Sequence, residues 1–330
     1  MFDSALAILT AAALGFAGAE AMARGRVLVD QPNERSSHKT PTPRGGGVGL
    51  VAGALFGAAW VAPPTPEILG LAGGALIAAI AGLLDDRRAQ GPAVKFGAQF
   101  LAAFVAMGAG LTFERVALPG FGTVELGWMG SLVTVLWFVG LTNAYNFMDG
   151  LDALAGTTGA VAAIFLGFAL LLLGQAPVAT MSFVLAAACL GFLAVNKPPA
   201  RVFMGDVGSQ FLGFAFAGLG VLAAKAESTG IAFWLVPLAL MHFLFDTLFT
   251  AARRALAGEN VLAAHKTHLY QRLNQAGFSH GRVAAFLAAM AAIQGNALLW
   301  LFEAPWPAML LPFALQLLYA RWVLSRSAAV

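Results

Sequence analysis

The feature that most restricts this chain is a succession of apolar stretches, each about as long as a bilayer is thick. A transmembrane helix needs roughly 20 mainly apolar residues, and eleven such windows follow one another along the 330-residue sequence. Only 11% of the residues are charged, whereas soluble domains carry about a quarter. The chain is therefore predicted to be an all-α, polytopic membrane protein with one membrane-embedded domain, 1–330. The windows are 4–22, 46–62, 67–84, 94–112, 127–147, 157–174, 177–195, 208–224, 230–252, 281–302 and 307–324.

The distribution of charge predicts how these spans are oriented. Asp3 precedes the first window and Arg24 and Arg26 follow it, the reverse of a signal peptide, which carries its positive charge first. With the N-terminus outside and the spans alternating, only Arg115 and Lys225 of the 19 Lys and Arg residues fall on the outer side. Because basic residues favour the cytoplasmic side, the C-terminus is predicted to be cytoplasmic.

Aspartates gather on the same inner side, although the positive-inside rule does not require it. Apart from Asp3, every aspartate lies in an inner segment or at the inner end of a span. They are Asp30, Asp85, Asp86, Asp149, Asp152, Asp206 and Asp246. The basic residues are spread among short loops and form no stripe with interleaved aromatics, which disfavours nucleic acid as a partner. The inner acids therefore indicate a site.

The stretch 196–213, NKPPARVFMGDVGSQFLG, is unlike a lipid-facing helix. Two prolines stop the preceding helix, and Gly205 and Gly208 flank Asp206. A carboxylate between glycines lets a metal or a phosphate approach the backbone. An ordinary solvated loop is the alternative interpretation.

Two earlier inner segments have a similar character. In 30–47, Lys39 and Arg44 precede three glycines that open a helix, which suits either an anion site or a plain linker. In 82–88, Asp85 and Asp86 end a span. This pair is either a base with a metal-steering acid or a helix end whose acids are neutralised by nearby arginines.

The two remaining segments add amides, acids and histidines. Asn143, Asn146, Asp149 and Asp152 recur every three residues, so they project to one side of a helix or tight turn. Such groups at the end of a membrane span tend to be functional. Further on, 265–272 holds two histidines three apart among basic neighbours; they lack the partners for a zinc site and fit better beside phosphate oxygens. Together the segments suit a divalent cation and a diphosphate, the requirements of phosphoryl transfer.

The chain resembles the polyprenyl-phosphate N-acetylhexosamine-1-phosphate transferases of glycosyltransferase family 4, which include the enzyme that makes lipid I of peptidoglycan. The resemblance rests on PTPRGGG (41–47), LLDD (83–86), NxxNxxDGLD (143–152), NxPPARVFMGDxGSxFLG (196–213) and HxxHxYQRL (265–273). The last motif is similar to the branch that initiates O-antigen or other envelope polysaccharides, and it lacks the HHxxE of the lipid I enzyme. Ala153 stands where many relatives carry glycine.

This resemblance implies that undecaprenyl phosphate attacks the β-phosphorus of a UDP-N-acetylhexosamine and displaces UMP. It implies Mg²⁺, with Mn²⁺ as a substitute, on Asp206, and it places Asp85 and Asp86 near the lipid phosphate, with one of them as the proposed base. The implied catalytic histidines are His265 and His268, at the diphosphate. The implied substrate-binding residues are Lys39, Asn146, Asp149, Asp152, Asn196, Phe203 and Arg272, with Phe203 stacked on uracil.

Several alternatives stay open at this point. A phosphate monoester has a second pKa near 6, so the lipid phosphate is mostly dianionic at pH 7 and the two adjacent aspartates need not act as a base. A transporter of an anionic solute is the rival class, and UDP-MurNAc-pentapeptide is the rival donor. The sugar, the pathway and the oligomeric state, with a homodimer as one option, are undecided. The expected location is the bacterial inner membrane, with the active site on the cytoplasmic face.

Overall fold

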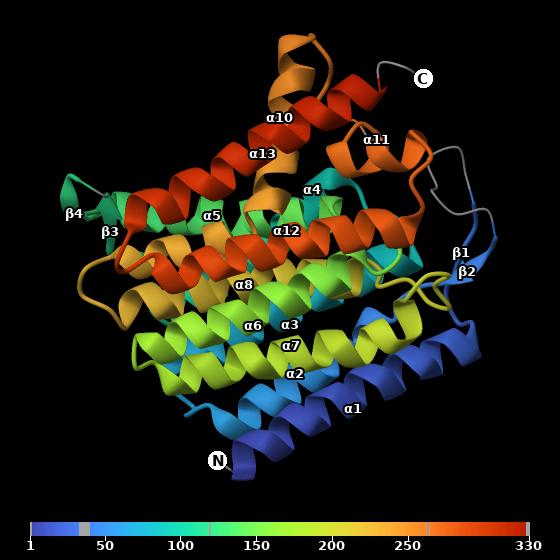
Figure 1. The fold of residues 1–330 in the computed structure, drawn as a ribbon. Coiled ribbons are helices and arrows are strands. Elements are labelled where there is room, and N and C mark those ends of the chain that lie inside the picture. Colours follow the sequence, from blue (N-terminus) through green and yellow to red (C-terminus); the bar gives the residue numbers. More distant parts are fainter. Residues whose placement is uncertain (1, 33–39, 119, 262, 264, 328–330) are drawn as a thin grey trace.

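The computed structural model describes residues 2–32, 40–118, 120–261, 263 and 265–327, and its elements are mainly long helices (Figure 1). The first eight helices are α1 (Phe2–Gly25), α2 (Gly47–Val61), α3 (Pro66–Arg87), α4 (Pro92–Gly108), α5 (Met129–Phe147), α6 (Leu154–Leu172), α7 (Ala176–Asn196) and α8 (Asp206–Lys225). After them come η1 (Ile231–Trp234), α9 (Leu235–Ala239), α10 (Met241–Leu256), α11 (Leu269–Gln275), α12 (His280–Trp300) and α13 (Pro305–Ser327).

Each of the eleven apolar windows contains helix, which agrees with a polytopic membrane protein. Of the helices that the structure describes, seven are long and apolar enough to cross a membrane, or eight if one bent pair counts as a span. Helices α2 and α4, with 15 and 17 residues, are apolar but shorter. The number of eleven spans and their orientation therefore stay predictions.

The window 230–252 is not a single straight span, contrary to the prediction. The segments Ile231–Ala239 and Met241–Leu256 meet at an angle of 75°. Pro237 lies inside α9, three residues before Leu240. Its missing N–H and fixed ring disturb the helix on the N-terminal side, where α9 follows the 3-10 turn η1. Figure 1 shows α10 standing across the other helices and projecting beyond them. The helix does extend through Arg253 and Arg254, as the sequence predicts.

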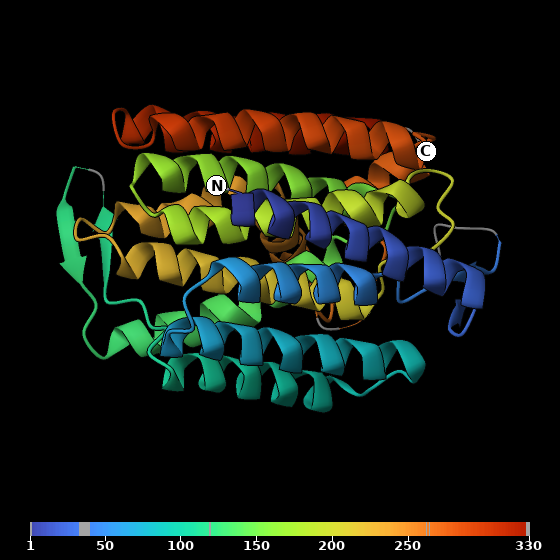
Figure 2. The same cartoon turned by 90° about the horizontal axis from the view of Figure 1, so that it is seen from below.

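Two small antiparallel sheets also depart from the all-α prediction. Strands β1 (Val29–Asp30) and β2 (Thr42–Pro43) form one pair, and β3 (Arg115–Leu118) and β4 (Gly122–Glu125) form the other. Runs of two to four residues are too short to produce a recognisable alternation in the sequence. The main helices run side by side between these sheets, with β1 and β2 at one end and β3 and β4 at the other (Figure 2).

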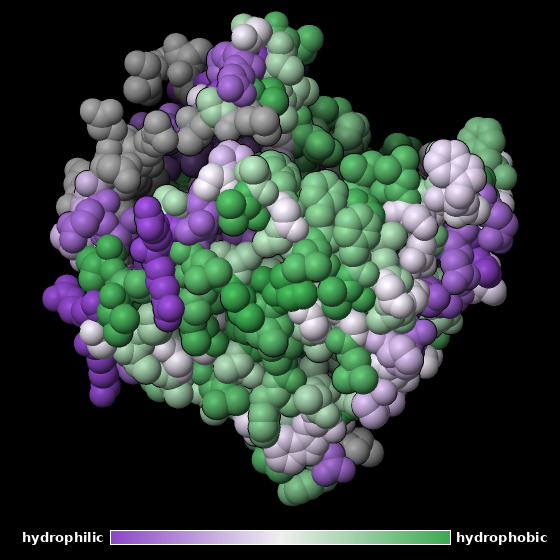
Figure 3. All heavy atoms as spheres, turned by 180° about the vertical axis from the view of Figure 1, so that it is seen from behind, coloured by the Kyte–Doolittle hydropathy of each residue, from purple (hydrophilic) through white to green (hydrophobic). Residues whose placement is uncertain are grey.

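The surface agrees with a membrane setting. Figure 3 shows a broad apolar face, with hydrophilic residues gathered towards the two ends of the molecule. Many large apolar side chains are solvent-accessible in the isolated chain, among them Leu69, Leu101 and Phe104. Lipid is the environment in which such exposure costs little.

Helix α8 lies at the centre of the bundle, with 94% of its apolar window buried. It packs against α3 and α5, while α1, α2, α7, α6 and α12 pack in succession beside it. A Cβ atom on Gly82 of α3 would overlap the backbone of Asp206, and one on Gly47 of α2 would overlap Gly208. These close approaches bring the start of α2 and the end of α3 against the start of α8.

Candidate active site

The start of α8 is capped by Asp86, which comes from α3. Its Oδ1 accepts a hydrogen bond from the Asp206 backbone N–H at 2.9 Å, and its Oδ2 accepts one from Val207 at 3.1 Å. A carboxylate at a helix N-terminus is stabilised by the unpaired N–H groups and by the helix dipole. Gly205, at φ +76°, makes room for this carboxylate, because a Cβ there would overlap it. Asp86 therefore fixes where α8 begins and where Asp206 stands.

Two cations are interleaved with three acids at this point. The Arg44 Nη2 lies 2.6 Å from Asp86 Oδ1 and 3.9 Å from Asp206 Oδ1. The Lys95 Nζ lies 2.7 Å from Asp85 Oδ2 and 3.4 Å from Asp206 Oδ2. Asp206 thus lies close to both positive groups. Arg44 also contacts Asp86, and Lys95 also contacts Asp85.

Asp149 adds a fourth carboxylate, from the turn after α5. Among the described residues its carboxylate has no hydrogen bond or ion pair, in contrast to its neighbours. Burial and the negative charges of Asp206 and Asp86 raise the pKa of Asp149 above its ordinary value. Nearby, the Asn146 side chain donates a hydrogen bond to Ser209 Oγ at 2.8 Å. An acid under this repulsion is stabilised by an added cation.

No three His, Cys, Asp or Glu side chains form a ready-made metal site within the described part of the chain. Mg²⁺, however, needs only one or two carboxylates, with waters and substrate phosphates as its other ligands. The carboxylates of Asp149 and Asp206 fit this donor set, because Asp149 is unpaired among the described residues and Asp206 is close enough to repel it. The four acids also outnumber the two neighbouring cations, Arg44 and Lys95.

Two predicted substrate-binding residues hold the 196–205 loop. The Asn196 Oδ1 accepts from the Ala153 backbone N–H and its Nδ2 donates to the Val202 carbonyl, both at 2.8 Å. The Asp152 Oδ2 accepts from the Ala200 backbone N–H at 3.1 Å, and its Oδ1 lies 3.2 Å from His280 Nδ1. Both side chains are engaged by the protein itself, so their contact with a nucleotide stays a prediction.

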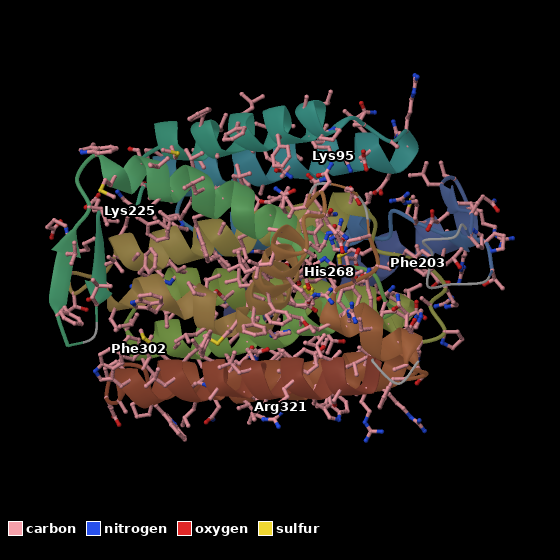
Figure 4. All side chains as sticks on the ribbon, turned by 90° about the horizontal axis from the view of Figure 1, so that it is seen from above. Lys95, Phe203, Lys225, His268, Phe302 and Arg321 are labelled. Carbon is pink, nitrogen blue, oxygen red and sulfur yellow. The ribbon has the colours of Figure 1, made fainter. Side chains whose placement is uncertain are left out.

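The histidine segment, residues 265–273, packs against the end of α5. The rings of His265 and His268 are tilted to each other with centroids 4.9 Å apart, and the centroid of the His268 ring lies 6.1 Å from that of Phe147. The Tyr270 hydroxyl donates to the Phe147 carbonyl at 2.9 Å, which docks α11 on the end of α5, two residues before Asp149. Figure 4 shows Lys95, His268 and Phe203 towards one end of the molecule and Lys225 and Phe302 at the other.

The electrostatics of the loops follow from burial and neighbouring charge. Burial opposes the charge on Arg44, but the carboxylates of Asp86 and Asp206 outweigh it and raise the pKa of Arg44. Burial, helped by His268, lowers the pKa of His265 to about 4, so this imidazole is neutral at pH 7. Burial also lowers the pKa of Arg272, whose Nε donates to the Thr267 carbonyl at 3.3 Å.

The structure thus brings together Asp85, Asp86, Asp149 and Asp206, with Asn146 beside them. The two histidines lie near the end of α5, which precedes Asp149. The role of each remains a prediction, and Lys39 lies outside the described residues. Sequence reasoning missed Lys95, and it counted Asp246 among the inner aspartates without giving it a role. Asp246 accepts a hydrogen bond from His268. Lys95 and Asp246 both carried a usable signal, because each is an ionisable residue inside an apolar window.

The fold and the site define a polytopic membrane protein with a cluster of acids and cations where several helices end. Residues 68–224 match the family pattern described as "glycosyl transferase family 4". This range includes all four clustered aspartates, whereas the histidine segment lies beyond it.

Three relatives extend the similarity over most of the chain. A probable undecaprenyl-phosphate N-acetylglucosaminyl 1-phosphate transferase of Bacillus subtilis is 35% identical over 76% of this chain and 71% of its own. A decaprenyl-phosphate N-acetylglucosaminephosphotransferase of Mycobacterium tuberculosis is 35% identical over 85% and 78%. A phospho-N-acetylmuramoyl-pentapeptide-transferase of Moorella thermoacetica is 34% identical over 80% and 85%. The chain belongs to this family of membrane sugar-phosphate transferases, which confirms the resemblance seen in its motifs.

Proposed function

We propose that this protein transfers an N-acetylhexosamine 1-phosphate from a UDP-sugar to undecaprenyl phosphate. An oxygen of the lipid phosphate attacks the β-phosphorus of the UDP-sugar, the bond from this phosphorus to the bridging oxygen breaks, and UMP leaves with that oxygen. The product is a polyprenyl diphosphate that carries the sugar. The reaction needs no redox partner and, because the lipid phosphate is mostly dianionic at pH 7, no obligatory base.

The observation that carries this proposal is the position of the acid–cation cluster. Asp85 and Asp86 end α3, and Asp206 begins α8, so the cluster lies where the apolar part of the bundle stops. A lipid phosphate whose chain lies in the membrane reaches this level, and a water-soluble UDP-sugar reaches the same level from the adjoining aqueous phase. Arg44 and Lys95 are the cations that the cluster already contains.

The residues suggest a division of labour in phosphoryl transfer, which depends mainly on positioning and charge neutralisation. Arg44 and Lys95 would attract phosphate oxygens, and Asp149 and Asp206 would hold Mg²⁺, with Mn²⁺ as a substitute. The chemistry that such a metal supplies is neutralisation and orientation of the diphosphate. His268 would face the same diphosphate. When a substrate phosphate binds, Lys95 would leave Asp85 and contact that phosphate.

The donor that we propose to test first is UDP-N-acetylglucosamine, because the names of the Bacillus and Mycobacterium relatives specify that sugar. We further propose that the product initiates an envelope polysaccharide of the O-antigen type, at the inner membrane, with the site on the cytoplasmic face. UDP-MurNAc-pentapeptide remains a second donor, since the Moorella relative is named for it.

The direct test measures UMP release by purified full-length protein with undecaprenyl phosphate and a panel of UDP-sugars. We expect release that requires both substrates and a divalent cation, with UDP-N-acetylglucosamine above UDP-MurNAc-pentapeptide. The reverse order would move the assignment to peptidoglycan synthesis. Absence of UMP release with every donor, together with uptake of an anionic solute by proteoliposomes, would overturn the proposal in favour of a transporter.

A further inference from the structure

Asp246 is a buried carboxylate in α10 with four hydrogen-bond donors around it. Its Oδ1 accepts from His268 Nδ1 at 3.1 Å and from the Leu269 backbone N–H at 2.9 Å, and its Oδ2 accepts from the Tyr270 backbone N–H at 3.2 Å. Thr250 Oγ1 donates to Oδ1 at 3.0 Å. Only 1% of the residue is exposed, so it does not itself reach a solvent-borne substrate.

These contacts leave His268 little freedom. The bond from Nδ1 to Asp246 fixes how the imidazole is turned within its plane. The rings of His265 on one side and Phe147 and Tyr270 around it restrict the plane itself, with centroids 4.9, 6.1 and 5.9 Å away. Nε2 is then the one ring nitrogen left for a ligand, because Nδ1 donates to the carboxylate.

We propose that Asp246 is a positioning residue that holds His268 with Nε2 directed at the diphosphate of the substrate. The carboxylate acts through the histidine, as acceptors behind ligating or catalytic imidazoles do in other proteins. The inference rests on the proposed transferase function and adds to it a residue outside the family's matched range. The bend before α10 lies a few residues ahead of Asp246, whose carboxylate contacts the first two residues of α11.

A purely structural role is the competing interpretation. Asp246 also caps α11 by accepting from the Leu269 and Tyr270 N–H groups, so its loss would loosen this short helix in any case. The two roles differ in one respect. A cap matters whether or not the imidazole is present, whereas a positioning residue has no effect on rate once the imidazole is gone.

The experiment is a double-mutant cycle on kcat for UMP release, with KM for the UDP-sugar measured in parallel. It uses the full-length protein in detergent as wild type, Asp246→Asn, His268→Ala and the double variant. We expect Asp246→Asn to lower kcat by about 10–100-fold, the range for loss of such a supporting partner. KM should change by less than about threefold, and the double variant should be as slow as His268→Ala alone. Thr250→Val removes one bond to the same carboxylate but spares the histidine, so its kcat should stay near the wild-type value.

The outcomes separate the two interpretations. If the losses from the two single changes multiply in the double variant, Asp246 does not act through His268 and the proposal is wrong. If Asp246→Asn does not purify, Asp246→Glu keeps the charge and shifts it by one methylene, and the same cycle is run with it. A wild type without UMP release on any donor removes the proposed function and this inference together, whereas an active wild type with an additive cycle removes the inference alone.

Discussion

Substituting each of the two adjacent aspartates by asparagine should affect stability very differently. The Asp86 side chain is fully buried and receives two backbone N–H groups and Arg44. Asparagine keeps one oxygen but presents an amide N–H to the second donor, which leaves a buried N–H unpaired and removes the ion pair. Each lost charged hydrogen bond is worth about 1.5–3 kcal/mol and an unpaired buried group about 1–3 kcal/mol. Burial raises the pKa of Asp86 to about 6, so a neutral amide regains part of this loss, and we expect Asp86→Asn to cost about 3 kcal/mol.

Asp85→Asn is the matched control, one residue earlier on the same helix. The Asp85 carboxylate contacts Lys95, which is 35% exposed, and the Gln90 backbone N–H. Asparagine can still accept from Gln90 through its oxygen and loses only a partly solvated ion pair, worth about 1 kcal/mol or less. The difference between the two variants should therefore be about 2 kcal/mol or more.

The assay uses the single cysteine of the chain. Cys189 is buried, so a thiol-reactive fluorescent dye reacts with it only when the bundle opens. Heating the two variants and the wild type in the same detergent and at the same scan rate gives apparent Tm values. At about 2–4 °C per kcal/mol, Asp86→Asn should melt roughly 4–8 °C below Asp85→Asn. Equal shifts, or a larger shift for Asp85→Asn, would show that the capping argument is mistaken.

Three further predictions concern the metal, the pH dependence and the topology. Asp206→Asn should abolish UMP release while the protein still purifies normally, and EDTA should stop the wild type until Mg²⁺ or Mn²⁺ is added; strong activity of the variant at ordinary Mg²⁺ would contradict the metal site. Because burial lowers the pKa of His265 from 6.5 to about 4, only the unfolded chain binds that proton between these values, so stability should fall as the pH drops from 6.5 to 4. His265→Gln should flatten this slope of apparent Tm against pH. A reporter that works only in the cytoplasm should be active when fused after Val330, and activity of an export-dependent reporter there instead would reverse the topology.

The helical content could be predicted from the sequence because the length and hydropathy of an apolar run are local properties of the chain. The direction in which a helix runs is not a local property. The window 230–252 has the length and apolarity of one span, yet the chain turns by 75° near Leu240. His242, Asp246 and Thr250 follow the turn at a spacing of four, so they form one polar face on α10. That face, rather than mean hydropathy, was the sign that α10 packs against protein instead of continuing through lipid.

The acids of the site could be predicted for a similar reason, since they lie where apolar windows end, which is visible in the sequence. Which acid contacts which cation or helix could not be predicted. Lys95 lies in one apolar window and Asp85 directly after another, and their contact depends on how α3 and α4 pack. The capping of α8 by Asp86 likewise depends on Gly82, whose lack of a side chain lets two backbones meet. Glycine in a helix indicates a close approach without saying to what.

The adjacent aspartates therefore differ more than their identical chemistry suggests. Successive residues of a helix point about 100° apart, so Asp86 faces the buried start of α8 while Asp85 faces Lys95 at the edge of the site. The first holds Asp206 in place through the backbone, and the second shares a cation with the same Asp206. A loss of activity would thus have a different origin in each variant. Asp86→Asn would displace Asp206, whereas Asp85→Asn would remove the carboxylate that pairs with Lys95. Activity alone cannot separate them, whereas the difference in unfolding temperature can, since only Asp86 supports the helix on which the acid stands.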